Sequence, residues 1–565
     1  MADRGAKPTD PPRRWLGLRP RTLILLAVCI AALTVLNREY LATEYAQGPY
    51  MKEPWRFPPP AVVFGLVAEA ALLLLVFRLS ERRGHPWKRR WHQFGLTDML
   101  LFTFLVSGGL SYWLSVRKDR EAIASRQREM EAAVEEEQRE RAFREALEAR
   151  GGTELHLEQW ELEPRLLDLI SQERSLKVLD LSSTAADDDT LKELSALTGL
   201  EVLRLNRTAV TDAGLETLAG FSQLRTLDLT DTSVTGAGLA HLARLKHLER
   251  LDLGGPDLSD ANLAHLAALP GLQHLSLSDC SFTPVGIDHV KQLRQLQSLS
   301  LVGEGATDAT LECLEGMTDL RLLSIGHAQV RGPGLKHLKG LKELRTLILQ
   351  FTPVGDEGIE HLEHLPRLES LRFARARIGD AGLARLKGLK ALKHLSLIET
   401  NVTAAGLAGT EYPANLESLD LRGGPLTDAG LASLRHTKNL QGLEIGETKV
   451  TDAGLAHLEG LTRLKRLSLR QTKVSDAGLI HLKGLGNLEE LVLSGTGVTD
   501  QGLRHLDALS GLRRLALDGT SITDTGLPHL KRLVKLQELS VGQTGITAQG
   551  WGDLRSALPN TDIRW

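Results

Sequence analysis

The feature that most limits the fold of this 565-residue sequence is a leucine that returns every 24 residues without an insertion. The recurring leucines are Leu176, Leu200, Leu224, Leu248, Leu272, Leu296, Leu320, Leu344, Leu368, Leu392, Leu416, Leu440, Leu464, Leu488, Leu512 and Leu536. This leucine opens a Leu-x-x-Leu-x-Leu pattern, as at Leu464, Leu467 and Leu469. A period of this length predicts a stack of small units, because one unit cannot bury its own apolar face.

Every repeat carries the signals of one short strand and one short helix. Leu467 and Leu469 alternate with the period of two expected of a strand whose leucines face inward. In the clean repeat 440–463, Thr451 is placed to cap a helix and Asp452 lies in its first turn. A stripe at helical spacing follows: Leu455, Leu458 and Leu461. The sequence therefore predicts an α/β solenoid with a parallel concave sheet and convex helices.

This pattern resembles the leucine-rich repeat over residues 152–565, in its ribonuclease-inhibitor-like and cysteine-containing subclasses. The Thr-Asp-Ala-Gly-Leu segment is similar to that of bacterial membrane-anchored leucine-rich repeat proteins. The resemblance implies a horseshoe-shaped scaffold for protein–protein interaction. Where that family has Asn after the strand, this chain mostly has Thr, as at Thr208, Thr232 and Thr472.

The two ends of the array depart from the consensus, as the exposed ends of a stacked core require. Leu155 keeps the register of Leu179, but Trp160 breaks the pattern, and Ile563 continues the register at the other end. We expect about 17 strands in a repeat domain that covers residues 151–565.

Three apolar segments precede the repeats, at about 22–36, 61–77 and 99–116. Each is close to the length that crosses a lipid bilayer, so residues 1–116 are predicted to form an all-α, three-helix transmembrane region. The first segment is short and has the alternative of a signal-peptide core. The second contains Glu69, which is a candidate functional residue because charges inside a span are costly.

The distribution of Lys and Arg predicts the orientation in the cell membrane. The N-terminal tail and the loop 78–95 carry six each, whereas the loop 37–60 carries three and the flank after the third segment five. The excess favours a cytoplasmic N-terminus, and three crossings then leave the repeats outside the cytoplasm.

A charged segment at residues 117–150 has no Gly or Pro and is predicted to form a helical stalk. It carries a thin apolar stripe: Ile123, Met130, Val134, Phe143 and Leu147. Two interpretations stay open, a solvated helix and a coiled coil that joins two copies into a dimer. Gly151 and Gly152 are expected to end the helix.

Composition and motifs argue against catalysis and against nucleic acid. The net charge is -3, whereas nucleic-acid-binding proteins usually have a basic excess. The sequence contains no GxxxxGK[ST], HExxH, GxSxG or CxxC motif, so we expect neither an enzyme nor a cofactor. Nine histidines share one helix position: His241, His265, His289, His337, His361, His457, His481, His505 and His529. We expect them, with Cys280 and Cys313, to be structural and not metal ligands.

The concave face changes character near the middle of the array, where apolar residues and arginines replace small or charged ones. The candidate protein-binding residues are Ile348, Gln350, Phe351, Arg372, Arg375, Ile398 and Glu399. Aromatic residues and Arg are enriched at interface centres, so the sequence predicts a protein partner here. Sequence drift is the simpler alternative, because scattered apolar surface residues are common.

Three functional hypotheses follow from this organisation. The chain is a membrane-anchored binding module, an envelope structural or spacer protein, or a sensor or transport accessory subunit that uses Glu69. The first is favoured, because the repeat resembles interaction scaffolds.

Overall fold

The structure is a computed structural model that describes residues 118, 122–131, 133–135, 137–255, 258–410 and 412–565. The chain divides into two compact units, Met1–Glu131 and Ala132–Trp565. The predicted spans at 22–36, 61–77 and 99–116, together with Glu69, lie outside the described residues. Within the described ranges no helix has the length and apolar character that a membrane crossing needs.

The second unit contains one parallel sheet of 18 strands, one more than the 17 expected. The strands are β1 (Glu154–His156), β2 (Val178–Asp180), β3 (Val202–Arg204), β4 (Thr226–Leu229), β5 (Arg250–Gly254), β6 (His274–Ser278), β7 (Ser298–Val302), β8 (Leu322–Gly326), β9 (Thr346–Gln350), β10 (Ser370–Ala374), β11 (His394–Ile398), β12 (Ser418–Asp420), β13 (Gly442–Glu444), β14 (Arg466–Ser468), β15 (Glu490–Val492), β16 (Arg514–Ala516), β17 (Glu538–Ser540) and β18 (Asp562–Arg564). Each strand pairs with the next along the chain, so residues 24 apart are neighbours, as Leu155 and Leu179 are.

Short α and 3-10 helices connect the strands. The α-helices are α4 (Pro164–Gln172), α5 (Asp188–Glu193), α6 (Asp212–Leu218), α7 (Leu239–Leu242), α8 (Asp260–Leu263), α9 (Pro284–Val290), α10 (Asp308–Glu312), α11 (Asp356–Ile359), α12 (Asp380–Arg385), α13 (Ala404–Ala408), α14 (Asp428–Leu431), α15 (Asp452–Leu455), α16 (Asp476–Leu479), α17 (Asp500–Leu503), α18 (Leu527–Leu530) and α19 (Ala548–Ala557). The 3-10 helices are η2 (Leu194–Ala196), η3 (Ala264–Ala268), η4 (Pro333–Gly340), η5 (Glu360–His364), η6 (Leu386–Gly388), η7 (Ala432–His436), η8 (Ala456–Leu458), η9 (Ile480–Leu482), η10 (Leu506–Ala508) and η11 (Asp524–Gly526).

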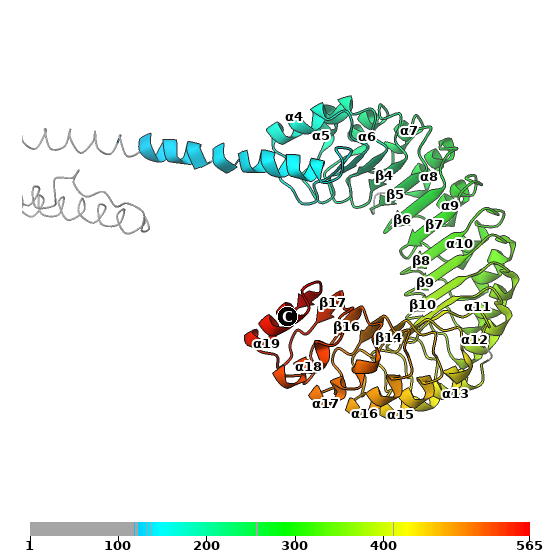
Figure 1. Ribbon diagram of the computed structural model, residues 1–565. Helices are drawn as coiled ribbons and strands as arrows, with labels where there is room; N and C mark the ends of the chain where they lie inside the picture. Colours follow the sequence, from blue (N-terminus) through cyan, green and yellow to red (C-terminus); the bar gives the residue numbers. More distant parts are fainter. Residues whose placement is uncertain (1–117, 119–121, 132, 136, 256–257, 411) are drawn as a thin grey trace, which may run out of the picture. The chain divides into compact units, whose positions relative to one another are not determined.

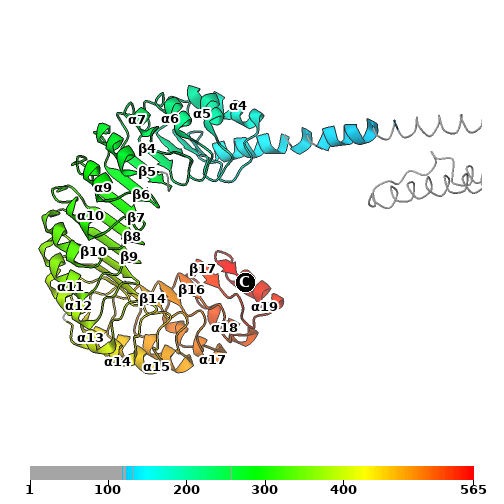
Figure 2. The same cartoon turned by 180° about the vertical axis from the view of Figure 1, so that it is seen from behind.

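Within the repeat unit the strands lie along the inner side of an arc and the helices along its outer side (Figure 1), and the opposite view shows the same two layers (Figure 2). The core lies between these layers. Leu467 and Leu469, which were expected to face inward, are 1% and 0% exposed. Leu455 and Leu458 of the helical segment are also buried, as is Leu461, which lies just after η8. The predicted solenoid and its leucine register are confirmed.

Most of the convex helices open with an aspartate that bonds to the following repeat. Asp428 Oδ1 accepts a hydrogen bond from the backbone N–H of Thr451 at 2.7 Å, and its Oδ2 accepts one from the Thr451 hydroxyl at 2.7 Å. Thr451 is the N-cap residue of α15 and Asp452 lies in its first turn, as predicted, but the Thr451 hydroxyl bonds to Asp428 and to no backbone N–H of its own helix. The pairs with both bonds are Asp188–Thr211, Asp212–Thr235, Asp260–Thr283, Asp380–Thr403, Asp428–Thr451, Asp452–Ser475, Asp476–Thr499, Asp500–Thr523 and Asp524–Thr547. Asp308–Arg331 and Asp356–Gly379 have the N–H bond alone, because Arg331 and Gly379 carry no hydroxyl.

The segment predicted as a stalk has two different halves. Its apolar residues Ile123, Met130 and Val134 are 52%, 69% and 48% exposed, whereas Phe143 and Leu147 belong to the core of the repeat unit. The helical residues 137–148 therefore cover the first repeat. Gly151 and Gly152 have φ of 70° and 74°, the left-handed conformation that ends a helix without steric cost.

Candidate functional site

A row of left-handed residues follows the strands on one edge of the concave face. In four successive repeats this row holds His327, Phe351, Arg375 and Glu399, with φ between 50° and 53°. Glycine fills the same position in other repeats, for example Gly495 with φ of 68°. A bulky residue such as Phe is rare in this conformation, so the aromatic ring is presented at a local conformational cost.

The four side chains in this row contact one another across repeats. The rings of His327 and Phe351 stack with centroids 4.4 Å apart and an interplanar angle of 10°. The guanidinium carbon of Arg375 lies 5.2 Å from the Phe351 ring centroid, within cation–π range. Arg375 also donates two hydrogen bonds to Glu399, at 2.7 and 3.2 Å. This pairing raises the pKa of the Arg375 guanidinium. The four side chains thus form one continuous chain of contacts.

Phe351 remains 40% exposed despite these contacts. No other phenylalanine among the described residues is exposed. The exposed Val285 and Ile480 lie on α9 and η9, which belong to the helical layer. Phe351 is therefore an exposed large apolar side chain on the sheet side of the central repeats.

The structure places all seven predicted site residues on three neighbouring strands or just after them. Ile348 in β9 is the direct register partner of Arg372 in β10. Gln350 and Ile398 lie two strands apart, because Ala374 stands between them in register. Sequence reasoning missed His327, although it occupies the Phe351 position one period earlier. We call these eight residues the Phe351 patch: His327, Ile348, Gln350, Phe351, Arg372, Arg375, Ile398 and Glu399.

Three of the four repeats that supply the Phe351 patch lack a hydrogen bond that most other repeats make, whereas the fourth makes it through Thr400. The Thr448 hydroxyl donates to the carbonyl of Ile445 at 2.7 Å, and eight further threonines do the same. At this position Ala328 and Ala376 have no hydroxyl, and the Thr352 hydroxyl is buried without a partner in the described structure. The turn after β9 and the turns of the two adjacent repeats therefore lack the threonine bond that most other repeats make.

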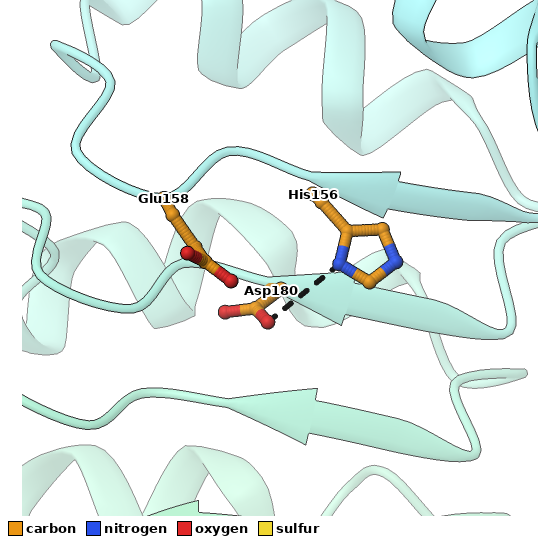
Figure 3. A group of neighbouring side chains, drawn as sticks. All are labelled: His156, Glu158 and Asp180. Atoms are coloured by element: carbon orange, nitrogen blue, oxygen red, sulfur yellow. Dashed lines mark ion pairs between the residues drawn. The ribbon is translucent and has the colours of Figure 1, made fainter. Parts of the chain in front are cut away.

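A second polar cluster lies at the start of the sheet and was not predicted. His156 in β1, Glu158 just after it and Asp180 in β2 have possible ligand atoms within 4.8 Å of one another (Figure 3). Asp180 already accepts bonds from the Arg204 guanidinium at 3.2 Å and from the Ser182 N–H at 3.0 Å. Because the Arg204 guanidinium already neutralises the Asp180 carboxylate, a metal ion bound by this cluster would have to displace Arg204. The shared register of His156 and Asp180 is the signal that could have found this cluster.

Three of the nine helix histidines, His337, His481 and His529, pair with an acid of the preceding repeat. His337 Nδ1 lies 2.7 Å from Glu315 Oε1, and His481 Nδ1 lies 2.6 Å from Glu459 Oε1. No group of three possible metal ligands among the described residues includes them. The Cys280 thiol is buried, and burial raises its pKa to about 11, which disfavours the reactive thiolate.

A family model described as a leucine-rich repeat region matches residues 212–494, half of the chain. The chain belongs to the leucine-rich repeat family. Threonines such as Thr208, Thr232 and Thr472 occupy the position after the strand at which an Asn was expected. A search of curated proteins finds no match to this leucine-rich repeat protein.

Solved structures with repeats of this kind resemble the chain at low identity. An internalin of Listeria monocytogenes is 21% identical, with a TM-score of 0.36 over 62% of this chain and 88% of its own. A leucine-rich repeat protein of Leptospira interrogans is 19% identical, with a TM-score of 0.37 over 73% and 90%. TLR13, solved in complex with the RNA ssRNA13, is 17% identical, with a TM-score of 0.47 over 71% and 73%.

Proposed function

We propose that this leucine-rich repeat protein is a membrane-anchored scaffold that binds a protein partner on its concave face. The observation that carries the proposal is the stacked, exposed Phe351 between His327 and Arg375. The proposal concerns binding and not catalysis, and it requires no cofactor. The repeat fold suits it, because a solenoid presents a long concave surface to a partner.

The geometry of the Phe351 patch matches the centre of a protein interface. Aromatic residues and Arg dominate the energetically important positions of interfaces. The stack with His327 and Arg375 restrains the Phe351 ring before binding, so little side-chain entropy is lost on association. Ile348 and Ile398 add half-buried apolar surface beside it.

Membrane anchoring rests on the apolar segments at 22–36, 61–77 and 99–116. The bias of Lys and Arg supports a cytoplasmic N-terminus and repeats outside the cytoplasm. A C-terminal alkaline phosphatase fusion, which is active only outside the bacterial cytoplasm, is expected to be active. An inactive phosphatase fusion together with a fluorescent C-terminal GFP fusion would contradict this orientation.

The exposed stripe of Ile123, Met130 and Val134 supports a dimer formed through the stalk. Met130 and Val134 are four residues apart, the d-to-a spacing of a coiled coil, and Ile123 precedes Met130 by one heptad. Sedimentation of the full chain in detergent is expected to show a dimer. The triple change of Ile123, Met130 and Val134 to Ser is expected to give a monomer.

Affinity capture with variants tests the binding surface. The full chain is used to capture partners from an envelope extract, and the partner's affinity is then measured for each variant. Phe351→Ala is expected to weaken binding by about 1–3 kcal/mol, with Ser494→Ala, two residues after β15, as the control. A partner whose affinity is unchanged by Phe351→Ala combined with Arg372→Ala would contradict the proposed surface.

A further inference from the structure

Most arginines in strands β1 to β18 form an ion pair with an Asp or Glu. The ion pairs of strand arginines are Arg204–Asp180, Arg250–Asp252, Arg514–Glu538 and Arg564–Asp562, and Arg422, two residues after β12, pairs with Asp420. Arg372 in β10 and Arg466 in β14 have no carboxylate partner among the described residues, and both are exposed. Arg372 is the one that lies inside the Phe351 patch.

The acids nearest to Arg372 along its own repeat and the next are already engaged. Glu369 pairs with Arg345 at 3.1 Å and with Lys393 at 2.9 Å. Glu399 accepts hydrogen bonds from two guanidinium nitrogens of Arg375. The positive charge of Arg372 is therefore not compensated inside the patch.

The register neighbours of Arg372 are uncharged. Ile348 lies beside it on one strand and Ser396 on the other, each about 4.8 Å away across the sheet. The four segments 321–327, 345–351, 369–375 and 393–399 carry five Lys or Arg and two Glu, a net charge of +3, although the whole chain has -3. This part of the concave face is thus a local positive region with an apolar centre.

We infer that the partner segment bound at the Phe351 patch is an acidic peptide segment, whose Asp or Glu carboxylate pairs with Arg372. This inference rests on the proposed binding function. An exposed guanidinium presents two parallel N–H donors, which match a carboxylate in a bidentate pair. An apolar side chain next to that carboxylate in the partner would contact Ile348 and the exposed edge of Phe351. Arg372 then selects acidic partners, and Phe351 supplies contact area.

A selection of random displayed peptides on the immobilised full chain tests this inference. The selected peptides are synthesised, and their affinities are measured by fluorescence anisotropy for wild type, Arg372→Gln, Phe351→Ala and Arg466→Gln. Arg466→Gln is the matched control, because it removes another exposed arginine without a carboxylate partner among the described residues, elsewhere on the same sheet. Circular dichroism confirms that each variant is folded.

We expect the selected peptides to share an Asp or Glu, and changing it to the amide to weaken binding about tenfold or more. On Arg372→Gln this amide change is expected to have no further effect, whereas on Arg466→Gln it keeps its full effect. Peptides that need Phe351 but tolerate loss of their acid would overturn this inference and leave the binding function intact. Peptides indifferent to Phe351→Ala, or no selected peptide at all, would overturn the proposed function itself.

Discussion

Asp428 and Thr451 join two successive repeats through both oxygens of one carboxylate, with N–H to Oδ1 and hydroxyl to Oδ2 distances of 2.7 Å each. The same arrangement recurs in most repeats, so most helix starts are hydrogen-bonded to the helix start of the following repeat. These bonds lie on the convex side, away from the Phe351 patch. They therefore offer a way to change stability without changing the proposed binding surface.

Removal of this carboxylate is expected to destabilise the array more than removal of its hydroxyl partner. Asp428→Ala leaves both the N–H and the hydroxyl of Thr451 without their acceptor and is expected to cost about 1–3 kcal/mol. Thr451→Ala removes only one bond and is expected to cost about 0.5–1.5 kcal/mol. Urea unfolding of the full chain measures both, and equal costs would argue against the two-bond arrangement.

Gly454, two residues after the aspartate that opens α15, is expected not to tolerate a side chain. A Cβ at Gly454 would lie 2.5 Å from Asp428 Oδ1 and 3.1 Å from Leu431 Cδ1. Gly454→Ala is therefore expected to destabilise by about 1–3 kcal/mol through overpacking. Gly486→Ala is the control, because nothing lies within 4 Å of its Cβ position, and it is expected to leave the unfolding midpoint unchanged or slightly raised.

Acid is expected to weaken the repeat contacts through their aspartates. Hydrogen bonds from the Thr547 hydroxyl and N–H lower the pKa of Asp524 below its ordinary value of 3.8. A lowered folded-state pKa adds stability above pH 3.8, and this stability is lost as the pH falls through the folded-state pKa. The difference in unfolding midpoint between wild type and Asp524→Asn is thus expected to be constant near neutral pH and to shrink below about pH 4. A difference in unfolding midpoint that grows in acid would contradict a lowered pKa of Asp524 in the folded state.

The helix before the repeats is expected to stabilise the first repeat through Phe143, which is 2% exposed. Phe143→Ala is expected to cost about 3–5 kcal/mol locally and to speed hydrogen exchange in β1 and β2. Val134→Ala, on the exposed half, is expected to leave that exchange unchanged. Equal exchange in wild type and Phe143→Ala would show that the helix does not act as a cap.

The sequence by itself determined the solenoid, its parallel register and its inward leucines. An uninterrupted 24-residue period allows only one stacking in which Leu155 meets Leu179 and every later leucine meets its successor. It also placed Ile348, Phe351, Arg372 and the other predicted residues on adjacent strands, since register follows directly from the period.

Tertiary structure alone decided which side chains contact one another. His327 stacks on Phe351 because both residues adopt a left-handed backbone, and no pattern of residue types specified that conformation there. The stalk stripe looks uniform in sequence, yet Phe143 is buried and Val134 is exposed, because only the first is placed against the first repeat's core. Such pairings depend on rotamers and on neighbours in other repeats, so periodicity fixes where a residue lies but not what it touches.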